Sequence, residues 1–198
     1  MSKSFPIIDS NYWDLQYSHG NTGWDVGYAI PAIVAYFEQI ENKDVKILIP
    51  GAGTAHEGIY LYNNGFKNIF LLDYSSIAVE MIKENYPDFP QKQIIYEDFY
   101  KHCGDYDFII EHTFFSAIKP KDRYLYVEKT HELLKNGGKL VGLLFDRTFE
   151  GKFPPYGGNK NDYKILFSEK FFIKTMETAI NSIKPRKNNE LFVIFEKI

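Results

Sequence analysis

The chain has 198 residues with a formal net charge of -3, and apolar residues make up 44% and charged residues 25% of it. This size and composition suit one globular domain that needs no disulfide or metal, and nothing in the charge indicates a surface for nucleic acid or membrane. The single cysteine, Cys103, excludes an internal disulfide and favours a reducing compartment. With no signal peptide at residues 1–12 and no apolar run long enough to span a bilayer, we expect a cytoplasmic protein.

Apolar runs alternate with helical patterns along most of the chain. Strands are expected at residues 45–49, 68–73, 93–96, 106–111, 139–145, 171–177 and 191–197, although the sixth run also fits a helix. Helices are expected at residues 31–41, 56–64, 75–86 and 121–134, and a Gly- and Pro-rich loop at 146–161. Such alternation predicts an α/β fold in which helices cover both faces of a mostly parallel sheet.

A glycine turn follows the first expected strand, where a doubly wound sheet binds its ligands. Gly51 and Gly53 allow a tight turn and a close approach of the backbone to a ligand. A dinucleotide fingerprint would place a third glycine where His56 stands, which weakens the case for a nicotinamide cofactor. Asp73 ends the second strand, 22 positions after Gly51, and can accept hydrogen bonds from two ribose hydroxyls. A turn or capping role for Asp73 is the alternative.

Two acids, Glu97 and Asp98, follow the third expected strand. In a sheet of this kind an acid at that place can accept a hydrogen bond from an adenine amine, although a solvated loop acid is equally compatible with the pattern. The Lys184–Lys187 turn, by contrast, is expected to be a solvated connection between the last two strands.

Several further motifs resemble the thiopurine S-methyltransferase family, and above all its thiol and halide methyltransferase branch. The likeness covers about residues 10 to 198. It is carried by residues 12–17 and 22–27 (YWDLQY and TGWDVG), 49–53 (IPGAG), 114–120 (FFSAIKP), 132–138 (ELLKNGG) and 154–156 (PPY). The resemblance implies a Rossmann-like class I fold that uses S-adenosylmethionine and releases S-adenosylhomocysteine. It further implies a seven-stranded sheet in one domain, with residues 1–41 as an N-terminal lid and helix and 42–198 as the core, in a monomer.

The resemblance also implies roles for individual residues at the cofactor. Trp13, Tyr17 and Trp24 would close over it, and their faces can attract the sulfonium cation. Gly51 would lie against the methionine part and Asp73 against the ribose. The remaining implied contacts are Glu97 and Asp98 at the adenine and His112 beside the transferred methyl group.

The acceptor side is less defined by the sequence. Phe114 and Phe115 could form the wall of an apolar substrate pocket or belong to the core, and Arg147 and Tyr156 stand in or beside the loop that follows the fifth strand. His112 could help to deprotonate a thiol or only hydrogen-bond near the cofactor. The five histidines show no metal-ligand spacing, so no metal is expected.

A small-molecule S-methyltransferase acting on a thiol, thiopurine or halide is therefore the leading hypothesis. A soft nucleophile needs little general-base assistance, which fits a chain without an obvious acid–base pair. An O- or N-methyltransferase of the same fold, a non-catalytic module that binds the cofactor, and a nicotinamide-dependent reductase are the alternatives.

Overall fold

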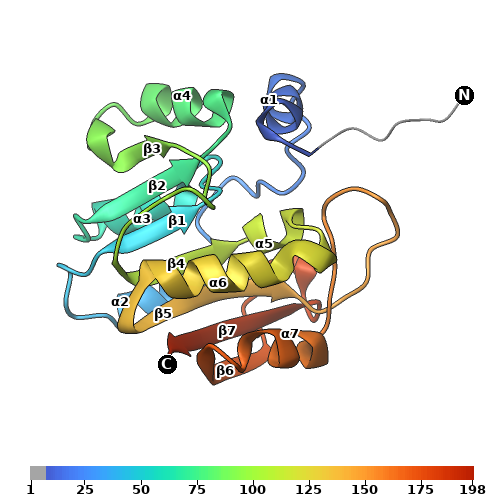
Figure 1. Ribbon diagram of the computed structural model, residues 1–198. Coiled ribbons are helices and arrows are strands. Elements are labelled where there is room, and N and C mark those ends of the chain that lie inside the picture. The colour runs from blue at the N-terminus through green and yellow to red at the C-terminus, as the bar shows by residue number, and fades with distance from the viewer. Residues whose placement is uncertain (1–7) are drawn as a thin grey trace, which may run out of the picture.

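The computed structural model describes residues 8–198, which form a single central sheet with helices packed on it (Figure 1). The strands are β1 Ile47–Pro50, β2 Ile69–Asp73, β3 Ile94–Tyr96, β4 Tyr106–His112, β5 Leu134–Phe145, β6 Phe171–Thr178 and β7 Glu190–Lys197. The α-helices are α1 Ser10–Ser18, α2 Pro31–Glu38, α3 His56–Asn63, α4 Ser76–Asn85, α5 Phe114–Ala117, α6 Arg123–Leu133 and α7 Lys160–Phe167. Three short 3₁₀ turns are η1 Gln91–Gln93, η2 Pro120–Asp122 and η3 Lys184–Arg186.

The sheet has seven strands in the order β3-β2-β1-β4-β5-β7-β6. The strands from β3 to β5 are parallel, whereas β7 is antiparallel to both β5 and β6. The predicted seven-stranded, mostly parallel sheet is therefore confirmed. The order reverses between β1 and β4, so the carboxyl ends of these two strands flank the switch point where α/β sheets bind their ligands.

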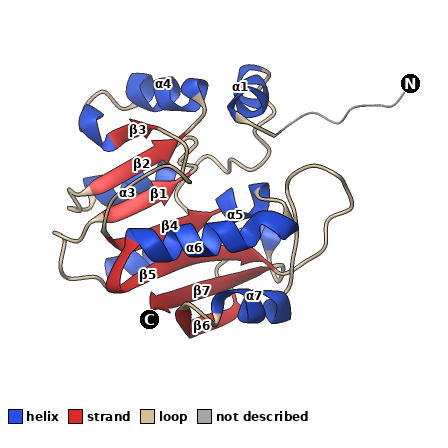
Figure 2. Ribbon diagram, viewed as in Figure 1, coloured by secondary structure: helices blue, strands red, loops and turns tan. Residues whose placement is uncertain are grey.

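Helices cover both faces of the sheet (Figure 2), and each face carries its own apolar core. On one face α2, α3 and α4 contribute Phe37, Leu61 and Ile82. On the other, α6 and α7 contribute Tyr126 and Phe167. Strands that helices cover on both faces consist of nearly continuous apolar residues. Strand β1 is such a strand, because it is buried along its whole length.

Several predicted boundaries change in ways that local chemistry explains. The helix expected at 121–134 starts only at Arg123, because η2 with Pro120 precedes it. The fifth strand starts at Leu134 rather than at residue 139, since Leu134 already pairs with Tyr106 on β4 and residues 135–138 form an irregularity within the strand. The ambiguous segment at 171–177 is strand β6. The α7 helix, capped by the Asn159 side chain, was not predicted, because it starts inside the expected loop.

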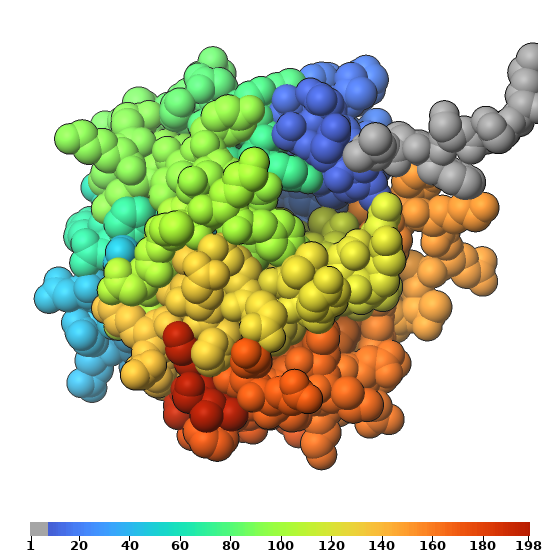
Figure 3. Space-filling view, in the orientation of Figure 1, coloured from blue at the N-terminus to red at the C-terminus, as the bar shows by residue number. Residues whose placement is uncertain are grey.

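The N-terminal helix α1 sits outside both cores. None of its residues is buried, and it lies beside α4, as the dark-blue and green atoms in Figure 3 show. Asp14 joins the two helices: its carboxylate accepts hydrogen bonds from Ser75 Oγ at 2.6 Å and from Ser76 Oγ at 3.0 Å. A third bond, from the Ile77 N–H at 3.3 Å, places this carboxylate at the amino end of α4, where the helix dipole favours an anion. The contacts of Asp14 that dock α1 on α4 are thus polar.

No helix among the described residues is long and apolar enough to cross a membrane.

Candidate functional site

A cavity of about 930 Å³ opens at the carboxyl edge of the sheet. Its lining comes from the N-terminal segment 8–28, which we call the lid segment. The ends of β1, β2, β4 and β5 and the β6–β7 connection also contribute. The volume lies toward the upper end of the range for small-molecule sites, so a cofactor and a small acceptor can lie there side by side.

The glycine turn after β1 lies on the floor of this cavity. Gly51 and Gly53 have φ angles of +61° and +54°, a conformation that glycine adopts without strain. A Cβ atom on Gly51 would lie 2.6 Å from the Phe114 ring, and one on Gly53 would lie 2.9 Å from the hydroxyl oxygen of Tyr17. The turn therefore requires glycine for both its backbone and its neighbours, and it brings the lid into direct contact with the core.

Asp73 ends β2 beside this turn, with only 6% of its surface exposed. Its Oδ2 accepts a hydrogen bond from the Gly53 N–H at 3.0 Å and its Oδ1 accepts one from the Ser75 N–H at 2.9 Å. Burial raises the pKa of Asp73 above its ordinary value, although these backbone bonds oppose the shift. Since each carboxylate oxygen has two lone pairs, both can still accept a hydroxyl from a ligand.

Three lid aromatics, Trp13, Tyr17 and Trp24, line the cavity as a group. The Trp24 ring contacts Trp13 edge-on at 5.4 Å and Tyr17 edge-on at 5.6 Å between ring centroids. Burial raises the pKa of Tyr17, so its hydroxyl stays protonated as a hydrogen-bond donor. The sequence hypothesis placed these three side chains together, and the structure does so.

Glu97 and Asp98 follow β3 and also line the cavity. Glu97 Oε2 lies 2.6 Å from His102 Nδ1, while the other ring nitrogen of His102 lies 2.7 Å from the Tyr106 hydroxyl. Asp98 Oδ1 accepts the Tyr100 N–H at 2.9 Å. Each acid is thus fixed by one of its oxygen atoms and can offer the other to a ligand.

His112 ends β4 at the centre of the cavity edge. Its Nδ1 lies 3.2 Å from Glu57 Oε1, and its Nε2 lies 2.9 Å from Arg186 Nη1. The next residue, Thr113, has a φ angle of +68°, which is strained for a β-branched residue. Such strain is common at functional sites, where the surrounding structure holds the backbone in place.

Of the four residues predicted for the acceptor side, two reach the cavity. Phe114 and Arg147 line it. Phe115 is only 2% exposed, lies outside the lining and packs against the rings of Tyr126 and Tyr163, so the core alternative describes it.

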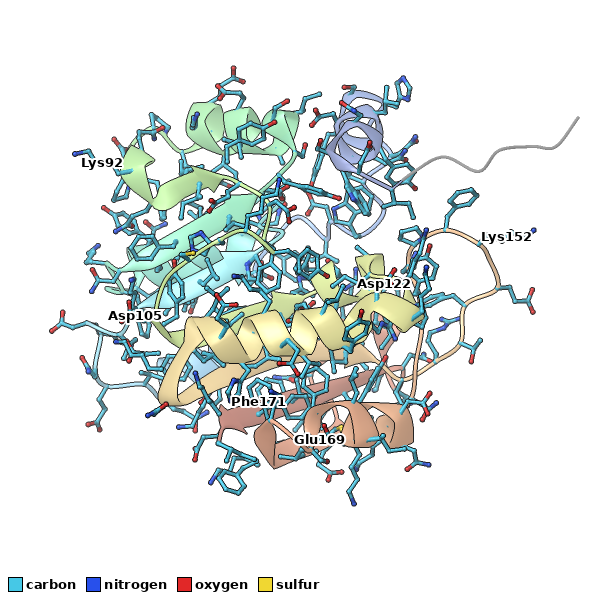
Figure 4. The ribbon with its side chains drawn as sticks, in the orientation of Figure 1. Lys92, Asp105, Asp122, Lys152, Glu169 and Phe171 are labelled. Carbon is cyan, nitrogen blue, oxygen red and sulfur yellow. The ribbon has the colours of Figure 1, made fainter. Side chains whose placement is uncertain are left out.

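Tyr156 also lies outside the main cavity. Its N–H donates to the Ser116 carbonyl at 2.7 Å, and its own carbonyl accepts from Arg123 Nη2 at 2.9 Å. Tyr156 therefore anchors the loop that follows β5, on which Figure 4 labels Lys152, and Arg123 is a buried clamp that the sequence did not indicate.

Arg186 and Glu57 are cavity residues that sequence reasoning missed. The turn that carries Arg186 was expected to be solvated, and this is wrong for Arg186, whose side chain is only 11% exposed. Nothing local in a Lys-Pro-Arg-Lys run distinguishes its third residue. Glu57 offered a weak signal, because it occupies the first turn of the helix that follows the glycine turn.

Among the charged side chains that line the cavity, acids outnumber bases. The acids are Asp9, Asp25, Glu57, Asp73, Glu97, Asp98 and Asp122, the last labelled at the start of α6 in Figure 4, and the bases are Lys119, Arg147 and Arg186. Seven carboxylates against three cations favour a ligand of net positive charge. No group of three or more His, Cys, Asp or Glu side chains among residues 8–198 could hold a metal ion.

The doubly wound sheet, the cavity at its switch point and the acid at the end of β2 are those of the Rossmann-like class I methyltransferase fold. The family model for thiopurine S-methyltransferase matches residues 8–198. The chain belongs to this family, and it is an S-adenosylmethionine-dependent methyltransferase.

Curated relatives and solved structures agree with this family. A probable thiol methyltransferase 2 from Arabidopsis thaliana is 28% identical over 91% of this chain and 82% of its own length. A thiocyanate methyltransferase 1 from Brassica oleracea is 27% identical over 96% of this chain and 87% of its own length. The fold is shared with Burkholderia thailandensis 1,6-didemethyltoxoflavin-N1-methyltransferase, solved with S-adenosylhomocysteine, at a TM-score of 0.76 and 13% identity over 98% of this chain and 92% of that one.

Proposed function

We propose that this cavity holds S-adenosylmethionine against the glycine turn and places a small soft nucleophile, such as a thiol, a thiopurine or a halide ion, at the ends of β4 and β5. The observation that carries the proposal is the hydrogen bond from the Gly53 N–H to Asp73, beneath the lid aromatics. This hydrogen bond joins the glycine turn, which a ligand can approach closely, to the buried carboxylate of Asp73. The turn suits the methionine part of the cofactor and the carboxylate suits its ribose.

The residues present fit the charge of the cofactor. A sulfonium is a cation, and the acidic lining together with the rings of Trp13, Tyr17 and Trp24 suits a cation within their reach. Glu97 and Asp98 stand after β3, on the adenine side of the ribose-binding acid in this arrangement. The cofactor supplies an electrophilic methyl group.

The protein's own contribution is positioning and the exclusion of water. The acceptor, the methyl carbon and the sulfur must lie in line, and positive charge is lost in the transition state, so alignment supplies most of the rate. Phe114, packed on Gly51, would limit where the acceptor can lie, and Arg147 would offer a cation to an anionic acceptor. The lid aromatics would keep water away from the nucleophile.

Calorimetric titration of the purified protein with S-adenosylmethionine and S-adenosylhomocysteine tests the site. We expect one-to-one binding of both, followed by methylation in a panel of thiols, thiopurines and iodide. Lack of binding would contradict the proposed site. Binding without turnover of any acceptor would indicate a non-catalytic module, and turnover of only hydroxyl or amine acceptors would indicate an O- or N-methyltransferase.

We further propose that the chain acts as a single-domain monomer in the cytoplasm. One free, exposed cysteine, Cys103, suits a reducing compartment. Light scattering at the concentrations used for activity tests the monomer, and a stable dimer would contradict it.

A further inference from the structure

A chain of hydrogen-bonding groups crosses the mouth of the cavity from the core to the lid. Glu57 on α3 lies 3.2 Å from His112 at the end of β4, and His112 lies 2.9 Å from Arg186 in η3. The second terminal nitrogen of Arg186, Nη2, donates to the backbone carbonyl oxygen of Trp24 at 2.8 Å. Segments 162 residues apart in the sequence therefore meet at one guanidinium group.

The chemistry of the guanidinium fixes the state of the histidine. Arginine donates hydrogen bonds and cannot accept them, so His112 Nε2 must be the acceptor in the bond to Arg186. The ring is then neutral, with its proton on Nδ1, and this proton points to Glu57. Glu57 Oε1 also accepts the Ile30 N–H at 3.2 Å, so the Glu57 carboxylate is fixed in place as the acceptor of this proton.

Arg186 is itself held in place by the core. It is largely buried, its guanidinium lies 5.5 Å from the centroid of the Phe145 ring, and its Nη1 lies 3.5 Å from Glu190 Oε1. Both Phe145 and Arg186 line the cavity at the ends of β5 and of the β6–β7 connection. The guanidinium of Arg186 is thus a fixed hydrogen-bond donor that can hold the lid segment in place through the Trp24 carbonyl.

We propose that Arg186 is a positioning residue that latches the lid through the Trp24 carbonyl, and that Glu57 and His112 orient it, with His112 acting as a hydrogen-bond acceptor and not as a general base. For turnover this inference rests on the function proposed above, whereas the hydrogen bond from Arg186 to the Trp24 carbonyl can be tested without a ligand. A base role would need His112 Nε2 to take the acceptor's proton. The resulting imidazolium would have lost the lone pair that receives Arg186 and would place a second cation beside it.

The tryptophans make the latch directly measurable. The chain has two, Trp13 and Trp24, and both lie in the lid segment, so fluorescence excited selectively in tryptophan reports on this segment alone. The variant Arg186→Met should expose them to acrylamide quenching in the free protein. It should also weaken S-adenosylhomocysteine binding roughly tenfold, the scale of a lost hydrogen bond to a charged group. The matched control Lys187→Met removes a cation from the next, exposed position and should leave both values as in the wild type.

Variants of His112 separate the two roles of the imidazole. In His112→Gln the amide oxygen can still accept from Arg186, so quenching should stay near the wild-type value, and the pH profile of thiol turnover should keep its wild-type shape. In His112→Leu the acceptor is lost, and we expect quenching to rise as in Arg186→Met. If His112→Gln instead keeps the lid closed yet loses thiol turnover, with recovery as the pH is raised, the imidazole is a base and the inference is wrong.

Unchanged quenching in Arg186→Met, with a wild-type melting temperature, would overturn the latch. A wild-type protein that binds no S-adenosylhomocysteine would contradict the proposed function, while the quenching comparison in the free protein would still decide on the latch.

Discussion

At the scale of single residues, Asp73 carries the clearest expectation for ligand binding. It supports the glycine turn through Gly53 and has acceptor capacity left for a ribose. We expect Asp73→Ala to weaken S-adenosylhomocysteine binding by about 1–2 kcal/mol or more, the scale of charge-assisted hydrogen bonds. Calorimetry measures this directly, with Asp88→Ala, at an exposed loop carboxylate, as the control. Unchanged affinity would remove Asp73 from the site.

Glu111 is fully buried beside His112, and it predicts a pH dependence of stability. Burial raises the pKa of its carboxyl to about 7, although hydrogen bonds from the Phe115 N–H and the Tyr126 hydroxyl oppose the shift. Between the ordinary value of 4.5 and about 7, the folded state holds a proton that the unfolded state has lost. The stability contributed by the protonated group is therefore complete below pH 4.5 and disappears as the pH rises through about 7.

The variant Glu111→Gln isolates this effect, because an amide does not titrate. Relative to the wild type, its free energy of unfolding should rise between these two pH values by roughly 3 kcal/mol at most, from 1.36 kcal/mol per pKa unit. Melting curves across this pH range check the slope. A constant difference between the two proteins would show that Glu111 titrates at its ordinary pKa.

At the scale of elements, the docking of α1 depends on side-chain contacts at the surface. Its nine residues bury no side chain, and a helix of that length is marginal by itself. The Asp14 carboxylate at the amino end of α4 therefore decides whether α1 docks. We expect Asp14→Ala to increase amide hydrogen exchange in residues 10–18 and leave the strands protected. Equal loss of protection in β1 would contradict a locally docked lid.

The elements also show what a sequence can predict. The strands and α3, α4 and α6 follow from apolar periodicity and from turn residues, because burial on the sheet dictates both. By contrast, α7 exposes the apolar Ile165 and follows a segment rich in Gly and Pro, so its sequence shows no apolar periodicity that separates it from the preceding loop. Periodicity also fails for α1, since this helix packs through a carboxylate and aromatic rings and not through an apolar stripe.

At the scale of the whole molecule, the site joins segments that only the fold brings together. Gly51 and Asp73 were predictable because strand ends of a parallel sheet meet at one edge. Phe115 was not separable from Phe114 by sequence, since adjacent residues differ only in which side of the chain they face. Arg186 reaches the lid across the sheet, and no local pattern records that contact.

Closure of the lid over a ligand should stabilise the whole molecule, because it ties α1 and η3 to the core through one cavity. With S-adenosylhomocysteine at 100 times its Kd, the gain is about 2.7 kcal/mol. For a chain of this size, that raises the melting temperature by roughly 5–11 °C.

The comparison of variants shows where that gain arises. Because residues of the lid segment line the cavity, Asp14→Ala and Arg186→Met should both show a smaller shift at the same ligand concentration, while Lys187→Met should match the wild type. A full shift in both lid variants would mean that the core alone binds the ligand and that the lid contributes nothing to affinity. Both variants could show a smaller ligand-induced rise in melting temperature while their ligand-free melting temperatures equal that of the wild type. The lid would then stabilise the core only when the ligand is bound.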